Sequence, residues 1–171
     1  VCGGKGGIGK SVLSILISMA LAETGQETVV IDGDLGGANL HTFMGIRTPG
    51  RTLNDFINRQ YATLDDVCMG TEQKGLRIIC GASEVLTLAN LKYAQKAKIL
   101  QAISKIQADH VVLDLGAGTG FNTLDFFLSA HRQIVVMTPQ PVAIQNAYAF
   151  VRNAVYRTLS RLTSRRPSLG D

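Results

Sequence analysis

The stretch Gly4-Lys5-Gly6-Gly7-Ile8-Gly9-Lys10-Ser11 decides the fold of this chain. It fits the pattern G-x-x-x-x-G-K-[ST] at every position. Glycines let backbone N–H groups converge on an anion, and a helix that starts at Lys10 adds the partial positive charge of its N-terminus. The Lys10 ammonium suits nucleotide phosphates, and the Ser11 hydroxyl suits Mg²⁺. We therefore predict a phosphate-binding loop over residues 4–11, the alternative being a flexible glycine turn.

Short apolar runs alternate with longer amphipathic segments along the rest of the chain. The runs are rich in β-branched residues and nearly unbroken, which is typical of strands buried on both faces of a parallel sheet. They cover residues 28–31, 76–79, 111–113 and 134–137. Helical spacing of apolar residues predicts helices over 10–24, 92–107, 122–130 and 142–162. Gly25 is the predicted C-cap of the first helix. A further short helix is predicted to begin after Thr52 as its N-cap. This alternation predicts an α/β fold with a doubly wound, mostly parallel sheet and helices on both faces.

Composition narrows the classes of protein that the chain can belong to. Its 171 residues suit about one domain, and 46% hydrophobic with 18% charged residues argue against a disordered chain. The absence of Trp and an aromatic content of 6% argue against binding of single strands by base stacking. No apolar run approaches the ~20 residues of a membrane helix. A net charge of +4 does not by itself imply a nucleic acid partner.

Several other kinds of site are not supported by residue spacing. The cysteines, at positions 2, 68 and 80, form no CxxC pair, so they read as reduced thiols of a cytoplasmic protein. The histidines, at positions 41, 110 and 131, lack the spacing of metal ligands. No G-x-S-x-G nucleophile signature occurs.

Acidic residues follow two of the predicted strands. Asp32 and Asp34 come directly after the run 28–31, and Asp114 ends the run 111–113. In open α/β sheets ligands bind at the carboxyl ends of the strands. A carboxylate at the end of a buried strand is costly unless a cation or hydrogen bonds compensate it, and Mg²⁺ reached through water would do so. The alternative is that these acids only cap turns or helices.

The loop contains an additional lysine, Lys5, that the general pattern does not require, and it indicates a resemblance to a known family. Lys5-Gly6-Gly7-Ile8-Gly9-Lys10-Ser11 resembles the deviant Walker A motif, KGGxGK[ST], of the MinD/ParA ATPases. The resemblance implies ATP or ADP and Mg²⁺ as ligands, bound by Gly4 through Ser11. It also implies that Lys5 reaches across an ATP-dependent homodimer to the partner's phosphates and shares in catalysis with Lys10. A solvated loop lysine is the alternative.

Two further stretches resemble the switch regions of that family. The pattern from Asp32 to Leu40 resembles switch I, which implies that Asp32 supports the magnesium shell, that Asp34 orients the attacking water and that Asn39 braces the loop. The stretch 114–118 is similar to switch II. Asp114 would then join Ser11 and Asp32 at the metal, and Gly116 would lie near the γ-phosphate.

Within the family, the chain looks like the FlhG/FleN (YlxH) flagellar-number regulators. The stretches that carry this resemblance are 81–84, 88–91, 114–118 and 138–141. It implies a molecular switch for flagellar number or placement, a flagellar or cell-pole protein partner, and peripheral attachment to the inner membrane through a C-terminal amphipathic helix. Members continue for another strand–helix portion. We therefore expect residues 1–171 to be a single ATPase domain, incomplete at the N-terminal strand and the C-terminal portion.

The last predicted helix offers a second hypothesis, a ParA-like partition ATPase that binds non-specific DNA. Arg157, Arg161 and Arg165 are four residues apart and would form its basic surface, the alternative being an ordinary solvated helix face. The opposite side of this helix is expected to be buried against the sheet, leaving only arginines exposed. That side carries Ile144, Ala147, Val151, Val155 and Leu162.

Overall fold

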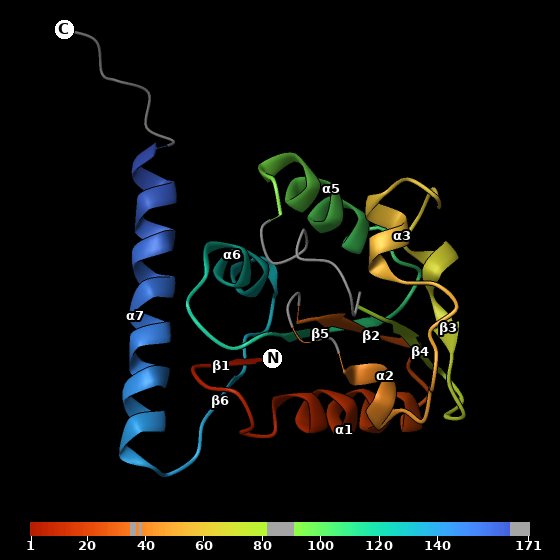
Figure 1. Ribbon diagram of the computed structural model, residues 1–171, viewed down its shortest axis with the longest axis horizontal. Helices are drawn as coiled ribbons and strands as arrows, with labels where there is room; N and C mark the ends of the chain where they lie inside the picture. The colour runs from red at the N-terminus through yellow and green to blue at the C-terminus, as the bar shows by residue number, and fades with distance from the viewer. Residues whose placement is uncertain (35–36, 38, 82–90, 165–171) are drawn as a thin grey trace, which may run out of the picture.

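The computed structural model describes residues 1–34, 37, 39–81 and 91–164 (Figure 1). Parts of the predicted switch I and subgroup motifs (residues 35, 36, 38 and 82–90), together with Arg165, lie outside the described residues. In chain order the elements are β1 (Cys2–Gly3), α1 (Lys10–Glu23), β2 (Thr28–Gly33), α2 (Leu40–Phe43), α3 (Leu53–Ile57), the 3₁₀ turn η1 (Asp65–Val67), β3 (Met69–Gly70), β4 (Leu76–Ile79), α5 (Tyr93–Ile103), β5 (His110–Leu115), α6 (Phe121–Ser129), β6 (Val135–Val136) and α7 (Pro141–Ser164).

The strands form a mostly parallel sheet, as predicted. Four of them pair in the order β3-β4-β2-β5 and two in the order β1-β6, with only β3 and β4 antiparallel. Backbone bonds of Val1 join the two parts, because its amino group donates to the Leu113 carbonyl at 2.6 Å and its carbonyl accepts from the Leu115 N–H at 2.9 Å. The spatial order is therefore β3-β4-β2-β5-β1-β6, and β1 lies beside β5.

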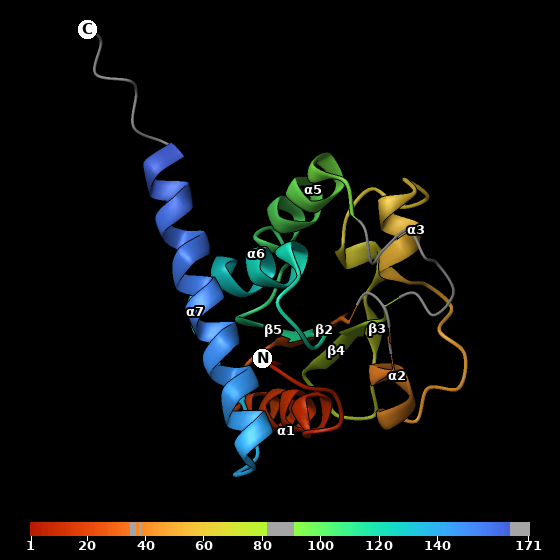
Figure 2. The ribbon, with the colours of Figure 1, turned by 60° about the vertical axis from the view of Figure 1, so that its left-hand side comes forward.

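Helices cover both faces of this sheet, which confirms the doubly wound arrangement (Figures 1 and 2). On one face Val30 and Ile78 belong to a buried cluster with Ile15 of α1. On the other face Val29 and Ile31 belong to a larger cluster with residues of α3, α5, α6 and α7. The alternation of side chains along β2 thus places successive residues in two different cores.

The local predictions hold at most positions. The C-cap of α1 is Thr24, one residue before the predicted Gly25, and Gly25 follows it with the left-handed φ of 84° that favours glycine. Thr52 and Asp55 form the predicted capping box at the start of α3. The prediction that every strand is buried on both faces is wrong for β5 and β6. Val111, Val112 and Leu113 of β5 and Val135 of β6 pack against the buried clusters but are only half-buried, whereas Leu115 at the end of β5 is buried.

The prediction for the buried side of α7 is wrong. The side that packs inward is the stripe Ala143, Ala147, Phe150 and Ala154, and the Phe127 ring of α6 meets the Phe150 ring edge-on at 4.9 Å. Small side chains let α7 approach the core closely, so they occupy the contact in place of the larger ones. The expected set keeps only Ala147 buried, while its other members are 47–59% exposed: Ile144, Val151, Val155 and Leu162.

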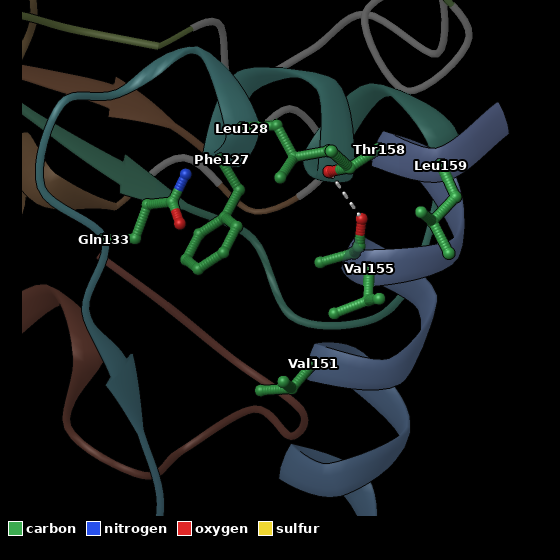
Figure 3. Close-up of a pocket in the computed structure, with 8 residues that line it drawn as sticks. Phe127, Leu128, Gln133, Val151, Val155, Thr158 and Leu159 are labelled. Carbon is green, nitrogen blue, oxygen red and sulfur yellow. Dashed lines mark hydrogen bonds between the residues drawn. The ribbon is translucent and has the colours of Figure 1, made fainter. Parts of the chain in front are cut away.

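An apolar groove of about 360 Å³ lies between α6 and the outer side of α7 (Figure 3). Phe127 and Leu128 line it from α6, and Val151, Val155 and Leu159 line it from α7. None of its lining residues belongs to the predicted phosphate site.

The arginines of α7 bear on the hypothesis of a basic DNA-binding surface. Arg157 forms a two-point ion pair with Asp125 of α6, with its Nε 2.9 Å from Oδ1 and its Nη2 3.0 Å from Oδ2. Arg161 and Lys96 of α5 also donate to this carboxylate. Two of the three arginines therefore continue the inward stripe of α7, because Asp125 is only 2% exposed. Both arginines are thus paired with Asp125, while the Arg161 side chain remains 42% exposed.

Candidate functional site

The predicted phosphate-binding loop connects β1 to the N-terminus of α1. Gly9 is the N-cap of α1 with a left-handed φ of 88°, a conformation that a side chain would strain. A Cβ atom added to Gly6, Gly7 or Gly9 would meet nothing within 4 Å, so these three glycines border open space. Gly4, in contrast, lies against the backbone of Asn146 in α7, which a Cβ would approach to 2.5 Å.

The Lys10 side chain lies beneath this open loop. It is 7% exposed, and its Nζ is 3.5 Å from the Lys5 carbonyl oxygen. Among the residues that the structure describes, no carboxylate forms an ion pair with Lys10. A buried ammonium with so little compensation is costly, and an anionic group bound in the loop would supply the missing charge. The Lys5 side chain is exposed at the rim, and Ser11 is half-buried in the first turn of α1.

Asp32 and Asp114 lie side by side, as their places at the strand ends predict. They are register partners on the adjacent parallel strands β2 and β5, and both are almost fully buried. Asp32 accepts backbone hydrogen bonds from the Asp34 N–H at 3.2 Å and the Leu40 N–H at 2.9 Å. Burial raises the pKa of Asp32 to about 7, and the charge of Asp114 adds to the effect. A cation near this pair would therefore be favourable for both carboxylates.

Asp114 has a partner that sequence reasoning missed. The Ser14 hydroxyl of α1 donates to Asp114 Oδ1 at 2.9 Å. Ser14 is fully buried on the face of α1 that packs on β5. The sequence feature that could have indicated this contact is a serine one helical turn after Lys10, on the inward face of an otherwise apolar helix.

The two predicted switch regions meet at Asp34 and Gly116. A Cβ atom added to Gly116 would lie 2.7 Å from Asp34 Oδ1, so a side chain at this position would displace the carboxylate. Asn39 donates from Nδ2 to the Gly37 carbonyl at 2.9 Å, a bond within its own loop that fits the predicted bracing role. Cys2 also contacts Gly116, with its Sγ 3.5 Å from the Gly116 carbonyl oxygen, and burial raises the pKa of this thiol to about 11.

The structure thus places the predicted residues at one edge of the sheet, where β1, β2 and β5 end. Within the described part of the chain, no three His, Cys, Asp or Glu side chains come together as an all-protein metal site. Mg²⁺ commonly takes one or two carboxylates, waters and the phosphates of its nucleotide as ligands. Ser11, Asp32 and Asp114 fit such a partial set.

A glycine loop between a parallel strand and a helix, a buried lysine and carboxylates on neighbouring strands define a phosphate-binding-loop NTPase. A sequence model of the ParA family, described as NUBPL iron-transfer P-loop NTPase, matches residues 1–156. The chain therefore belongs to the ParA family of P-loop NTPases.

Curated relatives agree with this assignment. The chain is 36% identical over 154 residues to the antiactivator FleN of Pseudomonas aeruginosa, covering 89% of this chain and 54% of FleN. It is 33% identical over 159 residues to the flagellum site-determining protein YlxH of Helicobacter pylori, covering 89% of this chain and 51% of YlxH. The septum site-determining protein MinD of Escherichia coli is 30% identical over 149 residues, 86% of this chain and 54% of MinD. The chain spans about half the length of these relatives.

Solved structures show the same fold. The septum site-determining protein MinD of Pyrococcus horikoshii, complexed with Mg-ADP, superposes with a TM-score of 0.76 at 25% identity over 94% of this chain and 63% of that one. A plasmid partition protein of Borrelia burgdorferi gives 0.75 at 18% identity over 91% of this chain and 72% of that one, which shows the fold alone. The prediction of a MinD/ParA-family protein that resembles the flagellar-number regulators is confirmed.

Proposed function

We propose that this chain belongs to a Mg²⁺-dependent ATPase that works as a molecular switch, and that residues 1–171 are part of a single ATPase domain. The observation that carries the proposal is the Lys10 ammonium, which is buried beneath an open glycine loop. Its Nζ lies 3.5 Å from the Lys5 carbonyl oxygen. A nucleotide phosphate at this position would receive the loop N–H groups, the helix N-terminus and the Lys10 charge together.

The site supports hydrolysis by position and charge rather than by a covalent step on the protein. Mg²⁺, when bound with the nucleotide, would neutralise charge that develops on the phosphoryl oxygens. Ser11, Asp32 and Asp114 would hold it, directly or through water. Asp34, which packs on Gly116 between the two switch regions, would orient the attacking water.

Asp34→Ala is expected to separate binding from hydrolysis. Because Asp34 would act on the water and not on the bound nucleotide, ATP affinity by titration calorimetry should stay within about threefold, whereas phosphate release falls at least about tenfold, or ~1.4 kcal/mol of barrier. Glu23→Ala, which removes an exposed carboxylate at the far end of α1, is the control and should change neither value. Undiminished turnover in Asp34→Ala would assign the water to another group.

Lys5→Ala is expected to remove ATP-dependent dimers while nucleotide binding persists. The Lys5 side chain is exposed, and Lys10 already serves the local phosphates, so Lys5 is free to reach a nucleotide in a second subunit. Light scattering with and without ATP measures the dimer, and Lys74→Ala, which removes another exposed lysine, is the control. Dimers that persist in Lys5→Ala would contradict a role for this lysine across the interface.

The cellular role that we propose follows the relative that is named a flagellum site-determining protein, YlxH, together with the resemblance to the flagellar-number regulators described above. On this basis the chain would control flagellar number or placement through a flagellar or cell-pole partner. We place the protein in the cytoplasm, with peripheral attachment to the inner membrane through an amphipathic helix outside these residues. No helix among the described residues is long and apolar enough to span a membrane.

A further inference from the structure

The neighbouring carboxylates of Asp114 and Asp32 differ in the hydrogen-bond donors that hold them. Asp32 accepts hydrogen bonds from two backbone N–H groups, so the loop itself holds its carboxylate. Asp114 is 2% exposed, yet the donor recorded for it among the described residues is a single hydroxyl, that of Ser14. A carboxylate has about four acceptor positions, so most of the capacity of Asp114 is left for other ligands.

The Ser14 hydroxyl has a choice of acceptors. Its oxygen lies 2.9 Å from Asp114 Oδ1 and 3.0 Å from the carbonyl oxygen of Lys10, one helical turn earlier. A hydroxyl carries one proton, and a bond to an ionised carboxylate is the stronger of the two. Ser14 therefore ties α1 to the end of β5, one helical turn after Lys10.

The geometry points to Ser14 as a positioning residue for Asp114. By holding Oδ1, the Ser14 hydroxyl would fix the side-chain rotamer of Asp114 and leave Oδ2 available to Mg²⁺ or one of its waters. Ser14 is not among the residues that would hold the nucleotide or the metal, and it would act through Asp114. This inference rests on the proposed function, because it assumes that Mg²⁺ and a nucleotide bind at this site.

The chain contains a matched control for this role. Ser18 is one turn further along α1, is also fully buried, and donates to the backbone carbonyl of Ser14, four residues earlier, at 2.7 Å. Its hydroxyl has no recorded bond to Asp114. Ser14→Ala and Ser18→Ala thus remove the same group from the same helix with the same burial, and they differ in the contact with the carboxylate.

The readout is the factor by which Mg²⁺ tightens ADP binding, measured by titration calorimetry with Mg²⁺ and again in EDTA. Losing a group that orients a metal ligand typically costs 10–100-fold in metal affinity. We expect Ser14→Ala to reduce the Mg²⁺ factor about tenfold, with ADP affinity in EDTA unchanged within about twofold. Ser18→Ala should keep the wild-type factor. Ser14→Cys, which retains a weak donor, should fall between Ser14→Ala and wild type, and it serves in place of Ser14→Ala if that variant does not fold.

The outcomes are distinguishable. An unchanged Mg²⁺ factor in Ser14→Ala, or an equal loss in Ser18→Ala, would overturn the positioning role while the proposed function stands. If the wild-type chain binds no ADP, or binds it without any effect of Mg²⁺, the proposed function itself fails and the role of Ser14 fails with it.

Discussion

Lys10→Ala is expected to weaken Mg·ATP binding by at least about 100-fold, which corresponds to ~2.7 kcal/mol. The Lys10 side chain is buried beneath the glycine loop, and no ion pair with a carboxylate is recorded for it within the described residues. Alanine would leave the bound phosphates with the loop N–H groups and the helix N-terminus but without their main countercharge. Titration calorimetry on this chain and on the variant measures the difference.

The stability of the ligand-free variant gives the same test a second readout. Because Lys10 is a buried charge with little compensation, its removal should not lower the free energy of unfolding of the ligand-free chain. Lost binding with retained stability would therefore locate the defect in the phosphate site. Lys74→Ala should leave ATP affinity unchanged. Wild-type affinity in Lys10→Ala would refute the assignment of the loop.

Asp125→Asn is expected to lower the free energy of unfolding by about 3–5 kcal/mol, the range for breaking a buried ion pair. The variant would leave Lys96, Arg157 and Arg161 around a neutral amide, and the Lys96 side chain is only 10% exposed. The loss would loosen the packing of α5 and α7 on α6. Asp65→Asn is the matched control, because its pair with Arg77 at 3.2 Å is about 30% exposed and surface pairs contribute ~1 kcal/mol or less.

The effect of Asp125→Asn should depend on pH in a defined direction. Burial alone would raise the pKa of Asp125, but the hydrogen bonds from Arg157 and Lys96 and the charge of Arg161 outweigh it and lower the pKa from 3.8 to about 2. The stabilisation is therefore complete above about pH 5 and is lost as the pH falls from ~4 toward ~2, a contribution of about 2 kcal/mol. Urea unfolding at several pH values should show wild type and variant converging in acid. A constant difference between them would contradict the ion-pair explanation.

The phosphate loop was predictable because its chemistry depends on neighbours along the chain. The spacing from Gly4 to Ser11 allows few other structures, and the structure places these residues between a strand and a helix as expected. Asp32 and Asp114 were predictable for a related reason. Parallel strands end at the same edge of a sheet, so the acids that follow two apolar runs lie together even though they are 82 positions apart in the sequence.

The buried side of helix α7 could not be predicted from the spacing of residues along the chain. Apolar residues occur on two adjacent stripes of this helix, and helical periodicity cannot decide which of them is buried. The structure buries the stripe of small residues around Phe150 and leaves Val151 and Val155 exposed beside the groove. The arginines at 157 and 161 looked like a free basic face, but their surroundings depend on Asp125, more than 30 residues away in a different helix.

The sequence by itself therefore determined the class of fold, the phosphate loop and the acidic residues at the strand ends, because each depends on local spacing or on the parallel alignment of strands. Only the tertiary structure decided which side of α7 is buried, that Asp125 collects Lys96, Arg157 and Arg161, and that Ser14 holds Asp114. These contacts join side chains from different elements. They depend on the distance and rotation at which helices pack, which a periodic pattern of residues does not specify.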